Sequence, residues 1–277
     1  MRINNNIGGM WAWTNLNRIN TSMFRVMEQL LTAQRIPRAG FDVAGLAVAN
    51  KLRAQMEGYT KSMENAQYGI NLLSTAEGGM TSIQDALQRM RELALQASNS
   101  TLTDADRAAL QEEFDQLRQG IAQTVKNTQY NGQNVLEGYK GEFQIGANEG
   151  ETLEVEIPNL NPENLKANIN DEEVNLNDLN ILTAQGANQA VEALDQMINQ
   201  VSEARSNVGA YINRLESGLK NAAKAMLNLT RSYDTIAGFD MAQGIMQQTR
   251  LMLLSNFTTG ILAQSNTNNT TVLRLLG

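Results

Sequence analysis

Apolar residues recur every three or four positions along most of the chain, which is the spacing of one face of an α-helix. The first such stripe lies between residues 3 and 33 and stops before Pro37, because a proline cannot continue the helical hydrogen bonds. A second stripe runs from Ala66 to Ala97 in strictly alternating steps of three and four, as in coiled coils. A third runs from Val191 to Ile236, so three long helices are predicted.

Shorter elements separate the second and third stripes. Residues 98–106 read as a turn with Thr103 or Asp104 as a helix cap, followed by a shorter helix that Gly132 closes. Residues 142–145 and 152–157 then alternate with a period of two around turn residues 148–150, which predicts a β-hairpin. Residues 158–182 give only weak structural signals.

A further long helix is predicted beyond Gly238, and its apolar face is unusually wide. The sequence thus predicts a mainly α protein, a long coiled-coil-like helical bundle formed by N- and C-terminal arms, with a small β-hairpin region in the middle. The stripes of the two terminal helices are apolar with few charges: Ile3, Ile7, Met10, Leu16, Ile19, Met23, Leu30, Met246, Leu253, Phe257 and Ile261.

Composition narrows the range of functions. The chain has 277 residues, a net charge of −7, no cysteine and no histidine, so thiol nucleophiles, imidazole bases and zinc sites of the usual kinds are excluded. The acidic stretches 148–151 and 171–173 lack the spacing of a calcium loop. We expect no enzyme activity, cofactor or metal site.

Charge is distributed unevenly along the chain. Residues 1–40 carry a net charge of +4 and residues 236–277 a net charge of +1, which leaves −12 for the residues between them. The basic residues are too few and too scattered to predict nucleic-acid binding. No apolar run reaches the roughly 18–20 residues of a membrane span, and no secretory signal of the cleaved type is expected. Because the apolar terminal helices lack a covering element, we expect them to be buried against other copies of the chain.

Several ordered blocks resemble bacterial flagellin over essentially the full length of the chain. The matching blocks are MRINNNI at 1–7, RIPRAGFDVAGLAVANKLRAQ at 35–55, NAQYGINLLSTAEGGM at 65–80, LQRMRELALQASN at 87–99, TQYNGQNVL at 128–136, FQIGAN at 143–148, RSNVGAYINRLE at 205–216 and DMAQ at 240–243. Only about 50 residues separate the two helical arms, so the chain resembles a minimal flagellin without the large variable outer domains.

The resemblance implies a structural subunit that self-assembles into the extracellular flagellar filament for swimming. It also implies a layout of an inner-core helix at 1–40, outer helices at 41–134 and 184–235, a hairpin and variable loop at 135–183, and a second inner-core helix at 236–277. Implied partners are other copies of the chain, an export chaperone, and the hook-junction and cap proteins. Export would use the flagellar type III apparatus.

Two kinds of residue depart from the family pattern. The family usually has Asn at the position of Pro37 and Asp at the position of Phe41, both in the connector that follows the first helix. Trp11 and Trp13 are also unexpected within that helix. We therefore expect repacked contacts among the inner helices of a specialised filament.

The resemblance also marks a surface read by the flagellin-recognising Toll-like receptor of animal cells. The matching residues are Arg89, Leu93 and Glu113. Arg89 and Leu93 are four residues apart and off the apolar stripe, so both are predicted to be exposed on one face of a helix. Packing between subunits is an equally good interpretation of these residues.

Other functions remain open at this point. A hook-filament junction protein would share the terminal helices, and a type III secreted translocator would insert amphipathic helices into membranes. The second is weak because residues 236–277 hold two arginines and no lysine, whereas membrane-binding helices are rich in both. A hydrolase would need a pair of carboxylates in a pocket, and no pocket-forming arrangement is predicted.

Overall fold

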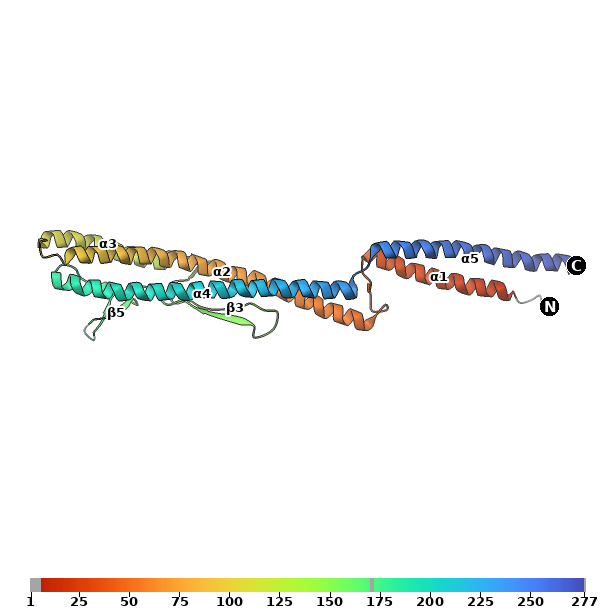
Figure 1. Cartoon of the computed structure of the whole chain (residues 1–277), viewed down its shortest axis with the longest axis horizontal. Helices are drawn as coiled ribbons and strands as arrows, with labels where there is room; N and C mark the ends of the chain where they lie inside the picture. The colour runs from red at the N-terminus through yellow and green to blue at the C-terminus, as the bar shows by residue number, and fades with distance from the viewer. Residues whose placement is uncertain (1–5, 170–171, 277) are drawn as a thin grey trace. The chain divides into compact units, whose positions relative to one another are not determined.

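The computed structural model describes residues 6–169 and 172–276, which form two compact units (Figure 1). Unit 1 comprises Met1–Met56 and Leu227–Gly277, and unit 2 comprises Glu57–Met226. Ile3, one of the predicted assembly residues, lies outside the described residues. The helices of the described chain are α1 (Ile7–Thr32), α2 (Val43–Ala97), α3 (Asp104–Asn127), α4 (Ala184–Ala237) and α5 (Met241–Leu276).

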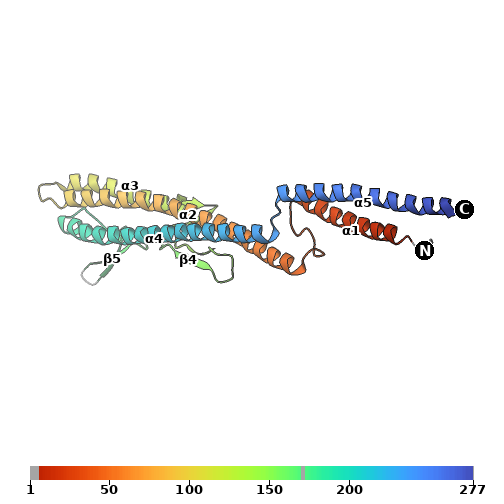
Figure 2. The ribbon, with the colours of Figure 1, turned by 45° about the vertical axis from the view of Figure 1, so that its right-hand side comes forward.

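Unit 2 is built on the lengthwise packing of α2, α3 and α4, visible in both ribbon views (Figures 1 and 2). All ten residues of the predicted 66–97 stripe are buried, which confirms the coiled-coil-like spacing of α2. Met80, Leu87 and Met90 are completely enclosed. Phe114 and Ile121 of α3 and Leu194 and Val201 of α4 complete this core.

The N-terminus of α3, in unit 2, forms as predicted. The Thr103 hydroxyl accepts from the backbone N–H of Asp106, and the Asp106 carboxylate accepts from the backbone N–H of Thr103. This reciprocal capping box satisfies two N–H groups that would otherwise lack partners. The predicted end of α3 at Gly132 is wrong, because the helix stops at Asn127.

Residues 129–134 instead form a tight hairpin of two short strands, β1 (Gln129–Tyr130) and β2 (Gln133–Asn134). Asn131 and Gly132 have φ angles of 52° and 77° in the turn between them. Asn and Gly are the two residues that adopt such left-handed angles most easily, and they favour two-residue hairpins as well as helix ends.

The predicted β-hairpin is confirmed as β3 (Lys140–Gln144) and β4 (Thr152–Glu156). Its inward side chains, Leu153 and Val155, join the core of unit 2. Residues 158–182, which gave only weak signals, contain a third hairpin, β5 (Lys166–Ile169) with β6 (Glu172–Asn175), and a short 3-10 helix, η1 (Leu176–Asp178). Ala167, Ile169 and Leu176 anchor this region in the same core.

Unit 1 is built on α1 and α5, which lie side by side in both ribbon views (Figures 1 and 2). They run antiparallel, because Asn6 bonds to Asn266 while Leu30 lies next to Gly244. The covered positions of each helix alternate in steps of three and four, as in a two-stranded coiled coil. In α1 they are Gly9, Ala12, Leu16, Ile19, Met23, Val26 and Leu30; in α5 they are Gly244, Gln248, Leu251, Ser255, Thr258, Leu262 and Ser265.

Candidate interaction surfaces

The α5 helix turns its more apolar face away from α1. The covered face is made largely of small or polar residues, including Gly244, Ser255 and Thr258. The predicted stripe lies on the other side. Its exposed fractions are 65% for Met246, 65% for Leu253, 71% for Phe257 and 48% for Ile261. Large apolar side chains with this exposure form a surface whose burial by another molecule is favourable in free energy.

The α1 helix divides its predicted stripe between two faces. Leu16, Ile19, Met23 and Leu30 are partly covered and lie on the side of α5. In the first turns Gly9 and Ala12 take the covered positions, so Ile7 and Met10 are exposed instead. The exposed face also carries Trp11, Trp13, Phe24 and Leu31. We call the exposed apolar faces of α1 and α5 the apolar surface of unit 1.

A group of polar contacts joins the start of α1 to α5. The Asn6 side chain accepts from the Gly9 backbone N–H at 2.8 Å and from the Ser265 hydroxyl at 2.7 Å. Its amide nitrogen donates to Asn266 Oδ1 at 3.0 Å. Asn6 therefore caps one helix and ties it to the other, which fixes the register of the pair.

The connector after α1 is held by a stack of two arginines and one aromatic ring. The guanidinium groups of Arg25 and Arg38 lie 5.9 and 5.7 Å from the centroid of the Phe41 ring. Both distances lie within cation–π range. Arg38 also forms an ion pair with Glu28 of α1 at 3.0 Å.

Backbone contacts fix the other side of the connector. The Arg35 N–H donates to the Ala237 carbonyl at 2.9 Å, and the Gln29 side chain donates to the Arg35 carbonyl at 2.7 Å. Pro37 follows Ile36, which is 6% exposed. Sequence reasoning placed Phe41 in the connector but missed Arg25 and Arg38 as its partners, because a cation–π stack has no fixed sequence spacing.

The predicted receptor residues lie where α2 contacts α3. Arg89 of α2 donates through Nε and Nη2 to Glu113 Oε1 of α3, at 3.0 and 2.8 Å, and through Nη1 to Glu92 at 3.0 Å. The bond to Glu113 is the main cause that holds the pKa of Arg89 above its usual value. Arg89 and Glu113 are thus neighbours at the surface, as a shared patch requires.

The predicted exposure of Leu93 is wrong. Its side chain is 1% exposed and belongs to the core of unit 2. The prediction assumed that α2 buries only one face, whereas this part of the helix contacts both α3 and α4. Arg89 pairs with α3, and Arg91 pairs with Asp195 of α4 at 2.6 Å. Leu93 is therefore not part of the exposed surface that Arg89 and Glu113 share.

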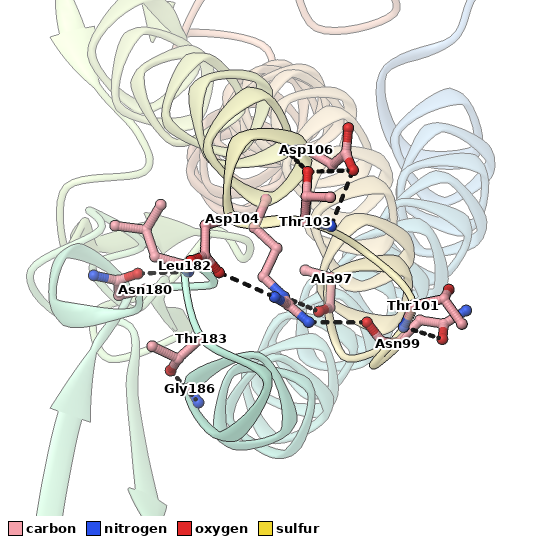
Figure 3. Close-up of polar contacts among 11 residues, drawn as sticks. Ala97, Asn99, Thr101, Thr103, Asp104, Asp106, Asn180, Leu182, Thr183 and Gly186 are labelled. Carbon is pink, nitrogen blue, oxygen red and sulfur yellow. Dashed lines mark hydrogen bonds and ion pairs between the residues drawn. The ribbon is translucent and has the colours of Figure 1, made fainter.

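A polar cluster holds the corner between α2 and α3 (Figure 3). The Arg107 guanidinium donates to the carbonyl oxygens of Ala97 and Asn99, both at 3.0 Å, and lies 3.4 Å from Asp104 Oδ1. The Arg107 side chain is only 10% exposed. It satisfies the Ala97 carbonyl at the C-terminus of α2, where helical carbonyls lack partners within the helix, and adds a second donor to the Asn99 carbonyl. No sequence pattern predicts this contact.

Side-chain caps also order the segment that leads into α4 (Figure 3). Asn180 accepts from the backbone N–H of Leu182 at 2.7 Å, and the Thr183 hydroxyl accepts from that of Gly186 at 3.0 Å. Thr183 thereby caps the first turn of α4.

The described residues contain no group of three or more carboxylates placed to hold a metal ion. In the 148–151 loop, the Glu151 carboxylate accepts from the backbone and side-chain amides of Asn148, which lowers the pKa of Glu151. Asp171 of the other acidic stretch lies outside the described residues. None of the described helices is long and apolar enough to cross a membrane.

Two family models cover most of the chain. The bacterial flagellin N-terminal helical region matches residues 3–141, and the bacterial flagellin C-terminal helical region matches residues 191–276. The chain belongs to the bacterial flagellin family. Only residues 142–190 lie between the two matched regions, so this is a small flagellin, in agreement with the predicted minimal form.

Relatives of similar length support this assignment. A flagellin of Halalkalibacterium halodurans is 38% identical over 278 residues, and a flagellin of Bacillus subtilis is 35% identical over 303 residues. Each alignment covers 100% of both chains. The flagellin family consists of structural proteins rather than enzymes, and this membership favours a filament subunit over a junction protein or a translocator.

A solved structure of low sequence identity is similar to this chain in fold alone. It is a candidate flagellar hook-associated protein of Vibrio parahaemolyticus, 16% identical, with a TM-score of 0.61 over 72% of this chain and 100% of that chain. The identity is too low to carry function from that protein to this flagellin.

Proposed function

We propose that the apolar surface of unit 1 is where neighbouring subunits contact this chain in the flagellar filament. As a flagellin, the chain is a structural subunit of that extracellular filament. The observation that carries the proposal is the orientation of α5, whose stripe of Met246, Leu253, Phe257 and Ile261 faces away from α1. A second apolar surface must cover this stripe for it to contribute stability.

The exposed residues of α1 extend the same proposal. Ile7 and Met10 are 68% and 66% exposed, and Trp11 and Trp13 are 71% and 61% exposed. Aromatic side chains with this exposure are typical anchors of protein interfaces. Repeated contacts between identical subunits that do not close into a ring produce an open helical filament.

Two substitutions at Leu253 test this function. Leu253→Asp places a charge in the proposed contact, and burying an unpaired charge is costly, so added subunits should fail to extend filament seeds. Leu253→Met keeps an apolar side chain of similar volume and should extend them normally. Elongation is followed by sedimentation and electron microscopy, after circular dichroism has shown that both variants fold. Normal elongation by Leu253→Asp would overturn the proposal.

The five segments inferred from the family resemblance give the proposed layout within the filament. Residues 1–40 and 236–277 supply the inner contacts, residues 41–134 and 184–235 supply the outer helices, and residues 135–183 supply the hairpin region. The connector at Pro37 and Phe41 repacks the contacts between the inner helices. A filament reconstruction tests both points, and the usual family geometry at 36–46 would contradict the repacking.

Other partners follow from the family. The export chaperone, the hook-junction proteins and the cap protein are proposed to bind this chain during export and assembly. Co-purification of each from the same organism with the full chain tests the proposal, and the apolar surface of unit 1 is the part that must be covered before assembly.

Arg89 and Glu113 are proposed to contact the flagellin-recognising Toll-like receptor, and Leu93 is left out of the contact because it is buried in the core of unit 2. Their side chains are 50% and 45% exposed, which leaves both accessible in the free chain. In a receptor reporter assay, Arg89→Ala should lower the response to soluble subunit, while Lys61→Ala in the same unit should not. No response to the unmodified subunit would reject this proposal.

A further inference from the structure

Among the described methionines, the completely buried ones lie in unit 2 and the most exposed ones lie in unit 1. Met80, Met90 and Met197 of unit 2 are completely buried. In unit 1, by contrast, Met10 is 66% exposed, Met246 65% and Met252 52%. A thioether is buried at little cost and contributes dispersion contacts, so exposed methionine marks either a surface that becomes covered or a site open to reaction.

We propose that Met10, Met246 and Met252 are oxidation sites through which peroxides prevent a free subunit from joining the filament. This inference rests on the proposed function of the apolar surface of unit 1. The chain has no cysteine, so no thiol competes with these thioethers for the oxidant.

The chemistry requires only a peroxide. The thioether sulfur attacks one oxygen of hydrogen peroxide, the O–O bond breaks, and a sulfoxide and one molecule of water result. Sulfur is oxidised by two electrons and the peroxide is reduced by two. Methionine sulfoxide is polar, and methionine sulfoxide reductases convert it back to the thioether.

The location of the three residues makes this change matter for assembly. Met246 is part of the exposed stripe of α5, and Met252 precedes Leu253 on the same helix. Met10 lies beside Trp11 and Trp13 on the exposed face of α1. Burying a sulfoxide there without a hydrogen-bond donor removes a polar group from water with no compensation, which opposes contact between subunits.

Assembly should in turn protect the same residues. Once a neighbouring subunit covers the apolar surface of unit 1, peroxide no longer reaches the sulfur atoms. Oxidation then acts on free subunits and spares those already in the filament. The buried methionines of unit 2 should stay reduced in both states.

The test uses the full chain and hydrogen peroxide, with peptide mass spectrometry to locate each sulfoxide. Oxidised subunits are offered to filament seeds, and the critical concentration for elongation should rise at least about tenfold. Treatment with methionine sulfoxide reductases should restore elongation. For Met10→Leu/Met246→Leu/Met252→Leu, which keeps the apolar volume, the critical concentration should be the same before and after peroxide treatment.

A matched variant identifies the responsible residues. Met63→Leu/Met226→Leu removes two half-buried methionines of unit 2 and should remain as sensitive as the unmodified chain. An unchanged critical concentration with all three sites oxidised would overturn this inference and leave the proposed function intact. Equal sensitivity of the triple leucine variant would also overturn it. If unoxidised subunits failed to elongate seeds, the proposed function itself would fall, and this inference with it.

Discussion

Arg107 is a buried cation that serves two helices. Its guanidinium bonds to the carbonyl oxygens of Ala97 and Asn99 and is enclosed by the α2–α3 corner. Arg107→Ala removes the guanidinium donor from both carbonyls and leaves the Asn99 carbonyl only the Leu102 N–H at 3.3 Å, so we expect the free energy of unfolding of the subunit to fall by about 2 kcal/mol. Urea unfolding followed by circular dichroism measures the change. Lys220→Ala, which removes an exposed ion pair with Glu216, should leave the midpoint unchanged.

Asp106 makes the stability of the same corner depend on pH. Hydrogen bonds from the Thr103 hydroxyl and the Thr103 backbone N–H lower the pKa of Asp106 in the folded chain. A lowered folded-state pKa stabilises the fold above the unfolded value of about 3.9, and this stabilisation disappears as the pH falls through the folded value.

Thr103→Val removes the hydroxyl donor and should raise the pKa of Asp106 toward its ordinary value. Thr103→Ser keeps the hydroxyl and should leave the titration close to that of the unmodified chain. Nuclear magnetic resonance titration of the Asp106 carboxyl measures both. A pKa that is the same in Thr103→Val and the unmodified chain would show that the side-chain bond does not stabilise the carboxylate.

Individual residues also show which contacts the sequence alone can predict and which it cannot. Thr103 could be predicted as a cap because the capping partner lies three residues away, within a local pattern. Leu93 could not be placed correctly, because its burial depends on packing in a core built from elements distant in the sequence. Arg107 was missed for a related reason: its acceptors are backbone carbonyl groups, which carry no sequence signature.

The connector between α1 and α2 depends on the Phe41 ring. Phe41→Ala removes both cation–π contacts, each worth about 0.5–1 kcal/mol when partly exposed. We expect faster hydrogen exchange of the backbone amides at 35–41, with the Arg35 amide the most sensitive because it bonds across to Ala237. Phe41→Tyr keeps the ring and should exchange at the original rate. Equal protection in the alanine variant would mean that backbone bonds alone hold the connector.

At the level of elements, periodicity predicted the helices and the β3–β4 hairpin because each carries its own repeat, but it placed the start of the second helix at Ala66 instead of Val43. It did not find β5 and β6, which are short and embedded in an Asn-rich segment. It also could not tell which face of α5 meets α1. The covered face contains Gly244, Ser255 and Thr258, and small residues allow close helix contact without an apolar signal.

The two units of the molecule carry net charges of opposite sign. Unit 1 contains 10 basic and 4 acidic residues, a net charge of +6, while unit 2 has a net charge of −13. Each subunit adds a net charge of −7 to the filament, so the acidic units of the assembled copies repel one another. The apolar surface of unit 1 must supply enough stabilisation to exceed this repulsion.

Ionic strength should therefore control the length and yield of filaments. Raising NaCl from about 0.01 M to about 0.15 M shortens the screening distance from about 30 Å to about 8 Å, and the critical concentration for elongation should fall.

Glu142 and Glu154 are exposed and directly opposite in the β3–β4 hairpin, so Glu142→Gln/Glu154→Gln reduces the charge of unit 2 to −11. This variant should elongate at lower salt than the unmodified chain. Lys140→Gln, which raises the magnitude of the negative charge, should need more salt. Identical salt dependence in all three chains would show that unit 2 charges do not oppose assembly.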